Sequence, residues 1–188
     1  ADGLVVAFTS IATNLVPGDA NGCADVFLRE LQTGAIRRVS VSTGGMEGNQ
    51  ASGHLGLAIS SDGRYLAFAS DASNLVPGDL RGATDVFDHD GQSGRTRRIS
   101  VSSHGSPGNL RSMRPAISHD GNLVAFGSAA INLVPADTNR TEDIFVHELG
   151  VAAVTLSRTG ACPGDLTLTI LNSTPGGKVA IACGSPGA

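Results

Sequence analysis

Hydrophobic and polar positions follow a pattern that recurs three times along the chain. The segment DGRYLAFASDASNLVPGDLRGATDVF, residues 62–87, has near copies that begin at Asp2 and at Asp120, so the offsets are 60 and 58 residues. In each copy an apolar run such as LVVAF or LVAF precedes a long loop and then a second short run, DVF or DIF. A fixed period of this length predicts stacked structural units rather than one irregular core.

The complete middle unit predicts four short strands. Its second strand is continuously apolar in the other copies, which is typical of a strand covered on both faces. Its fourth strand alternates, with Arg98, Ile99 and Ser100 in succession, which predicts one face in contact with water. Asp-Gly and Ser-Gly pairs between such runs are typical of β-hairpins. A buried inner strand and a half-exposed outer strand predict an all-β protein of propeller-type blades. The four strands are expected at residues 57–60, 65–70, 85–89 and 96–102.

The pattern divides the chain into three blades and a C-terminal remainder. The first unit lacks a first strand, and the third has no counterpart of the paired arginines of the fourth strand. Residues 166–171 and 179–183 correspond to the first two strands of a fourth unit. We therefore expect a half blade there, and an unrelated β-hairpin appendage is the alternative. The predicted boundaries are 1–56, 57–110, 111–160 and 161–188.

All six phenylalanines fall on two columns of the repeat. One column belongs to the second strand of each unit and the other to the third strand. Such regular placement predicts that the rings are buried between blades. The two columns are Phe8, Phe68 and Phe126, and Phe27, Phe87 and Phe145.

The element SxDGxxxAFxS, followed by a DVF strand and an RRxSVS strand, resembles the WD40-like (PD40) propeller repeats of the TolB-like group. The resemblance covers about residues 2–157. It implies a bacterial exported propeller, secreted or in the cell envelope, with the periplasm as the alternative location. It also implies a binding or scaffolding role rather than an enzymatic activity. The chain departs from the group in having about half of the usual six blades and a long NLVPGD loop in each.

Composition and charge argue against nucleic-acid binding and membrane insertion. The chain has 188 residues, 40% of them hydrophobic, which suffices for a buried core. Its formal net charge of −4 gives no basic footprint for nucleic acid. The apolar runs are far shorter than the roughly 18 residues that a transmembrane helix needs, so no membrane insertion is expected.

The three cysteines leave alternatives open. Cys162 and Cys183 bracket the last predicted hairpin, where the sequence is compatible with a disulfide or with two buried thiols. Cys23 lies in a predicted loop and has no counterpart in the other copies. It is expected to be a free thiol or an intermolecular link.

The loop after each second strand carries the clearest candidate chemistry. Oxygen atoms of Asp19, Asn21 and Asp25 could ligate calcium, a hard cation. The other copies place Arg81 or Arg140 in the same loop, however, and the spacing differs from that of an EF-hand. The alternative, which we favour, is that Asp and Asn cap a tight turn through their own backbone. No metal site is therefore predicted.

Neither the histidines nor the arginines suggest catalysis. His89 and His147 share a column with Arg29, which predicts an exposed blade position, and the other three histidines lie in loops. No nucleophile elbow, phosphate-binding loop or zinc-protease motif occurs. The paired arginines could form a stripe for an anionic partner, but solvated protection of a sheet edge is favoured. No catalytic or cofactor-binding residue, and no cofactor, is predicted. The remaining residues considered are His54, His104, His119, Arg37, Arg38, Arg97 and Arg98.

The expected function is that of a non-enzymatic structural protein. Unfinished units seek partners, and different ends make head-to-tail contacts, so we expect self-assembly into an oligomer or an extracellular filament or tube. The C-terminal hairpin, or the blade face beside it, is predicted to pack on the N-terminal blade of the next chain. A second candidate partner is another envelope or extracellular protein. The alternative function is a protein-, peptide- or glycan-binding module within a larger six-bladed propeller.

Overall fold

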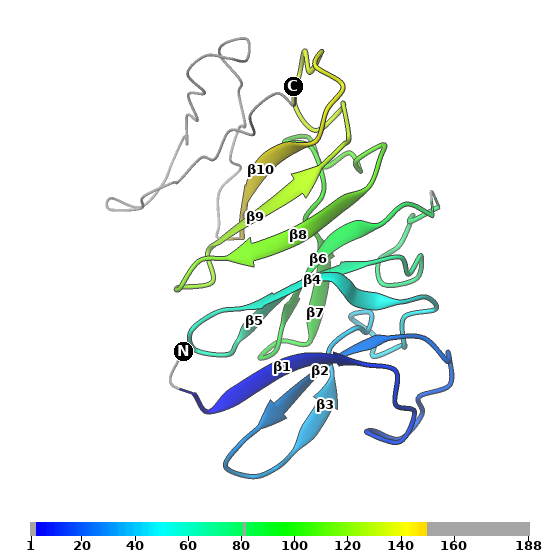
Figure 1. Cartoon of the computed structure of the whole chain (residues 1–188), viewed down its shortest axis with the longest axis vertical. Coiled ribbons are helices and arrows are strands. Elements are labelled where there is room, and N and C mark those ends of the chain that lie inside the picture. The colour runs from blue at the N-terminus through cyan, green and yellow to red at the C-terminus, as the bar shows by residue number, and fades with distance from the viewer. Residues whose placement is uncertain (1–2, 81, 150–188) are drawn as a thin grey trace, which may run out of the picture.

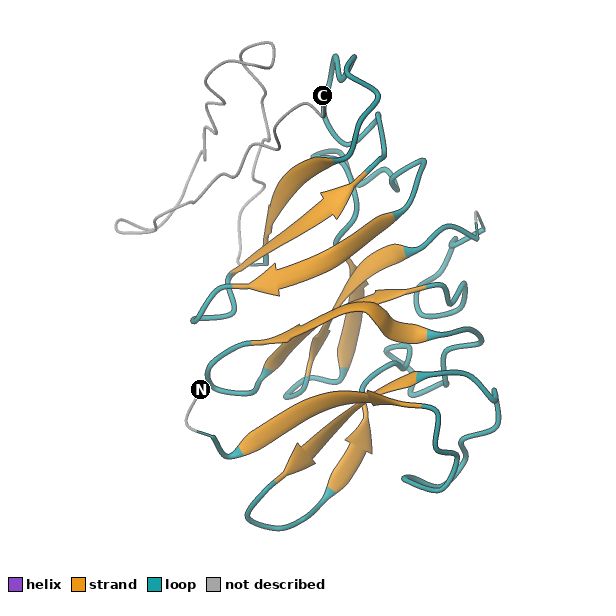
Figure 2. Ribbon diagram, in the orientation of Figure 1, coloured by secondary structure: helices purple, strands orange, loops and turns teal. Residues whose placement is uncertain are grey.

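The computed structural model describes residues 3–80 and 82–149, and every regular element within these ranges is a β-strand. The strands form three antiparallel sheets, blades 1 to 3 in chain order, as Figure 1 and Figure 2 show. The all-β class and the propeller-type blades expected from the sequence are confirmed. The expected C-terminal half blade, with Cys162 and Cys183, lies outside the described residues. Blade 1 contains β1 (Val5–Ser10), β2 (Asp25–Glu30) and β3 (Ile36–Arg38); blade 2 contains β4 (Ser52–Ile59), β5 (Tyr65–Ser70), β6 (Asp85–Asp90) and β7 (Arg95–Arg98); blade 3 contains β8 (Ser112–Ile117), β9 (Leu123–Ser128) and β10 (Asp143–Glu148).

Each sheet is a meander in which strands adjacent in sequence lie side by side. Blade 2 has the order β4-β5-β6-β7, and the three-stranded blades follow the same order. The outer hairpins turn at Gly34 and Gly94, with φ of 73° and 71°, a conformation that glycine adopts without steric cost. No helix of the described ranges is long and apolar enough to cross a membrane.

Neighbouring blades are held together through their faces. We call face A the side of a blade that carries the phenylalanines and face B the opposite side. Face B of blade 1 packs on face A of blade 2, and face B of blade 2 packs on face A of blade 3. The blades therefore stack in one direction, with blade 1 (blue) and blade 3 (green to yellow) at opposite ends in Figure 1. The first interface is formed chiefly by Val26, Leu28, Val39, Leu66, Phe68 and Phe87, and the second by Ala67, Val86, Ile99, Val124, Phe126 and Phe145.

The phenylalanine columns pair across the two central strands of each blade. Phe68 lies opposite Phe87 in the register of β5 and β6, and their rings stack at a centroid distance of 6.0 Å. The equivalent pairs of blades 1 and 3 stack at 5.7 and 5.9 Å. The predicted burial between blades is confirmed for Phe68, Phe87, Phe126 and Phe145, which lie in the two interfaces. Phe8 and Phe27 lie on face A of blade 1, which no described blade covers; Phe27 is nevertheless fully buried, whereas Phe8 is only half-buried.

Two strand predictions need correction. The first strand of blade 2 is longer than residues 57–60, because Gly53 and Gly56 at positive φ carry the chain through a bulge that interrupts the apolar pattern. The fourth strand ends at Arg98 rather than at residue 102. Beyond it, the Ile99 N–H still donates to the Val86 carbonyl, but the Val86 N–H is accepted by the Ser100 hydroxyl, which itself donates to Asp85.

The outer strand is also less exposed than its alternation predicts. Ser40 and Ser100 were expected on a face in contact with water, yet both are fully buried. The Ser40 hydroxyl donates to Asp25 and accepts the N–H of Val26, matching the contacts of Ser100 in the next blade. These serines are buried because they satisfy a carboxylate and a backbone donor inside the sheet.

Candidate functional site

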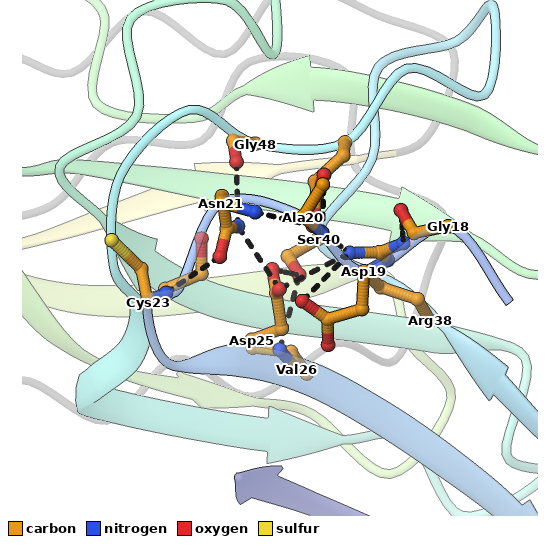
Figure 3. A network of polar contacts seen from close by, with 12 residues as sticks. Gly18, Asp19, Ala20, Asn21, Cys23, Asp25, Val26, Arg38, Ser40 and Gly48 are labelled. Atoms are coloured by element: carbon orange, nitrogen blue, oxygen red, sulfur yellow. Dashed lines mark hydrogen bonds and ion pairs between the residues drawn. The ribbon is translucent and has the colours of Figure 1, made fainter. Parts of the chain in front are cut away.

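A cluster of polar side chains ties the long loop of blade 1 to its outer strand, and Figure 3 shows it from close by. The Arg38 guanidinium, which is 9% exposed, lies at its centre. Its Nη1 is 3.7 Å from Asp19 Oδ1 and 3.3 Å from Asp25 Oδ2, and it also donates to Glu47. Its Nη2 donates to the carbonyl of Gly18 at 2.8 Å. The solvated role expected for Arg38 is therefore wrong, because acidic residues distant in sequence converge on it.

Asn21 shapes the loop beside this cluster. Its Oδ1 accepts the N–H of Cys23 at 2.6 Å, which closes a tight turn two residues long. Its Nδ2 donates to Asp25 Oδ2 at 3.0 Å and to the carbonyl of Gly48 at 2.8 Å. Asn21 thus acts as the turn-capping interpretation expects. Cys23 is a free, half-buried thiol.

The cluster has the spacing of a cation site but already contains a cation. Carboxylate oxygens of Asp19, Asp25 and Glu47 lie within 4.8 Å of one another. The guanidinium of Arg38 lies among them, so its positive charge stands where a metal ion would. One arginine among three carboxylates leaves the cluster acidic.

The pKa values of Asp19 and Glu47 shift in opposite directions in this cluster. Burial raises the pKa of Asp19, more than the charge of Arg38 lowers it. Burial also acts to raise the pKa of Glu47, but the Ala20 N–H and the Arg38 charge outweigh it and lower the pKa overall. Asp19 Oδ1 is buried without a hydrogen-bond partner among the described residues. The arrangement fixes the loop against the blade.

Blade 2 repeats the arrangement with one acid fewer. Arg98 lies 3.2 Å from Asp79 and 3.3 Å from Asp85, and all three side chains are buried. The position of Glu47 is taken by Pro107. The same loop, strand and arginine therefore form an internal ion pair in two consecutive units, which is typical of a structural part of the repeat.

His89 is buried, so its predicted exposure is wrong. Its Nδ1 lies 2.9 Å from the Thr96 hydroxyl, which donates to the carbonyl of Val41 in blade 1 at 2.5 Å. Burial, followed by the charge of Arg37, lowers the pKa of His89 to about 4, so the ring is neutral near pH 7. His147 is half-buried, and burial lowers its pKa too.

The other two of these arginines, Arg97 and Arg37, also depart from the expected solvated role. Arg97 donates to the buried carboxylate of Asp88 at 2.6 Å and to the carbonyl of Leu149 in blade 3 at 3.3 Å. Arg37 of blade 1 reaches over Gly91 of blade 2, where a Cβ would meet its guanidinium. Both side chains bridge to the next blade.

Within residues 3–80 and 82–149, the two ends of the stack present apolar side chains that no other described blade covers. On face A of blade 1, Val6 is 43% exposed, whereas its counterparts Leu66 and Val124 are fully buried. On face B of blade 3, Ile144 is 44% exposed, whereas Val26 and Val86 in the same column are fully buried. These two open faces are the candidate functional surfaces. They are equivalent to the face A and face B surfaces that pack on each other at both internal interfaces.

Sequence reasoning missed several of these residues. The sequence pattern did not predict a role for Glu47, Thr96 or Ile144, because each acts through a contact with another unit or a distant loop. A comparison of columns contains a signal for the ion pairs, since Asp19 and Asp79 recur together with the arginines. The exposure of Ile144 follows only from the order in which the blades stack.

Comparisons with known proteins leave the fold as the structure itself defines it. No protein-family model matches the chain, and no curated protein sequence matches it. The solved structures that are similar to it include the following three. TolB from Acinetobacter baumannii is 15% identical with a TM-score of 0.47, over 80% of this chain and 28% of that chain. A putative TolB from Agrobacterium tumefaciens is 16% identical with a TM-score of 0.47, over 82% of this chain and 45% of that one. The tricorn protease is 16% identical with a TM-score of 0.40, over 72% of this chain and 12% of that one. The chain thus spans less than half the length of each.

Proposed function

We propose that this chain is a non-enzymatic structural protein whose copies assemble head to tail. Face A of blade 1 in one copy packs on face B of blade 3 in the next. The observation that carries the proposal is the exposure of Val6 and Ile144 at positions whose counterparts are fully buried at both internal interfaces. Burying these surfaces in a copy of the interface that the chain already uses twice is favoured by the hydrophobic effect.

The edge of blade 1 offers a second contact to a neighbouring copy. In blades 2 and 3 the strands β5 and β9 each lie between two partners, whereas β1 pairs with β2 alone among the described residues. An unpaired edge presents backbone N–H and C=O groups to another strand. Because the two open surfaces differ, the contact is heterologous, and copies close into a ring or continue as a filament.

The polar clusters favour a structural role over a chemical one. Arg38 and Arg98 are paired with buried carboxylates, and the neutral His89 is hydrogen-bonded to Thr96. These groups join loops to strands and one blade to the next. A location outside the cell or in the cell envelope belongs to the proposal and rests on the resemblance of the repeats.

Light scattering after size exclusion, over a range of micromolar concentrations, tests the proposal. The average mass is expected to rise with concentration, and Val6→Asp is expected to abolish the rise, because it places a charge in the interface. Leu80→Asp is the matched control, since Leu80 is 90% exposed in a loop of blade 2 outside both open faces. A wild-type chain that stays monomeric throughout contradicts the proposal and favours a module that binds another protein within a larger propeller.

A further inference from the structure

Each internal interface places a side chain from one blade over a glycine of the next. A Cβ built on Gly63 would lie 2.4 Å from Cγ2 of Val5, and one built on Gly121 would lie 2.4 Å from Cδ2 of Tyr65. Both glycines have φ near 72°, where they turn the chain between the first two strands of their blades. The side chain of the preceding blade therefore occupies a notch that only glycine provides.

The same two columns have one member left at each end of the stack. Gly3 is the glycine of blade 1, with φ of 74°, and no heavy atom lies within 4 Å of the Cβ position. Leu123 begins β9 in blade 3 and shares the column of Val5 and Tyr65. Gly3 of blade 1 thus provides a notch that no described side chain fills. Leu123 of blade 3 is a side chain for which the described residues contain no notch.

We propose that Leu123 of one copy seats in the notch at Gly3 of the next copy and sets the register of assembly. This inference rests on the proposed head-to-tail function and adds the contact that aligns the two open faces. Leucine is intermediate in size between the valine and the tyrosine that fill the internal notches. At the internal interfaces the side chain lies too close to the glycine for any Cβ to fit. A shift of one blade along the other would therefore bring this side chain against neighbouring atoms, so the contact restricts the register.

The internal notch supplies the geometry for a crosslinking test. The Val5 Cβ lies 3.5 Å from the Cβ position at Gly63, within the range of about 3.5–4.5 Å that disulfides span. A cysteine pair at these two positions is therefore the intramolecular control. If the end contact reproduces the internal one, Gly3→Cys and Leu123→Cys in different copies fall at the same separation.

The experiment mixes two chains of different tag length, each carrying one of these cysteines. The native Cys23, Cys162 and Cys183 are changed to serine in both. Under mild oxidation with a glutathione buffer, the mixture is expected to give a disulfide-linked heterodimer on a non-reducing gel. Gly94→Cys replaces Gly3→Cys in the matched control, because Gly94 has φ of 71° and an equally open Cβ position in a hairpin of blade 2. That control is expected to give no link with Leu123→Cys.

The outcomes separate this inference from the proposed function. If the mixture assembles by light scattering but no heterodimer forms, the register is wrong while head-to-tail assembly stands. Equal linking by Gly94→Cys also overturns the register, because the link is then unspecific. If the wild-type chain does not assemble at all, the proposed function fails and the inference fails with it.

Discussion

Phe68 offers the sharpest test of how the blades pack. Its ring is fully buried between blades 1 and 2 and stacks on Phe87 at 6.0 Å. Phe68→Ala removes the transfer free energy of the ring and leaves a cavity, a loss of about 3–5 kcal/mol in the free energy of unfolding. The stacked pair contributes roughly 0.5–1.5 kcal/mol beyond the buried area.

Phe8 occupies the same column on the open face and serves as the internal comparison. Because its ring is only half-buried, Phe8→Ala is expected to cost about 1–2 kcal/mol, with no closed cavity left behind. Both free energies are measured by urea denaturation in an Ile144→Asp background, so that copies do not associate. A loss below about 1 kcal/mol for Phe68→Ala, or equal losses at the two positions, would refute the assignment of covered and open faces.

Three further predictions concern the polar groups. Arg98→Met leaves Asp79 and Asp85 buried without their guanidinium and is expected to cost about 3–5 kcal/mol, read from the denaturation midpoint; a loss below about 1 kcal/mol contradicts this. The pKa of His89 is about 4 in the folded state and about 6.5 in the unfolded state, so the unfolded state binds more protons between these values. Stability is therefore expected to fall by up to about 3 kcal/mol as pH falls from about 6.5 to about 4, and His89→Gln should flatten the wild-type profile there; an unchanged profile refutes the burial argument. A chelator is expected to leave the melting temperature unchanged, because Arg38 lies among the carboxylates; a drop that calcium restores would contradict this.

The inner parts of each unit could be predicted from the sequence. The apolar run of β5 and the run that forms β6 appeared at the expected residues, since strands covered on both faces show an unbroken hydrophobic signal. The repeat columns also placed the aromatic pair Phe68 and Phe87 correctly. These features are local, and their period is visible in the chain itself.

The outer parts could not be predicted, because their environment is set by other units. The alternation of Arg98 and Ser100 is normal for a strand in contact with water, yet Arg98 pairs with Asp79 of the long loop and Ser100 is buried against Asp85 at the start of β6. His89 is buried because Thr96 and blade 1 close over it, which no pattern along β6 shows. Charge pairs between residues far apart in sequence depend on tertiary contacts that a linear pattern does not record.

A mixing experiment tests the central claim most directly. Val6→Asp spoils face A of blade 1 and keeps the open face of blade 3, whereas Ile144→Asp does the reverse. Each variant alone is expected to remain monomeric in sedimentation equilibrium. Their mixture should form a dimer of one copy of each and nothing larger, because a single intact pair of faces remains. A mixture that stays monomeric, or variants that still assemble alone, would contradict head-to-tail packing of the blade faces.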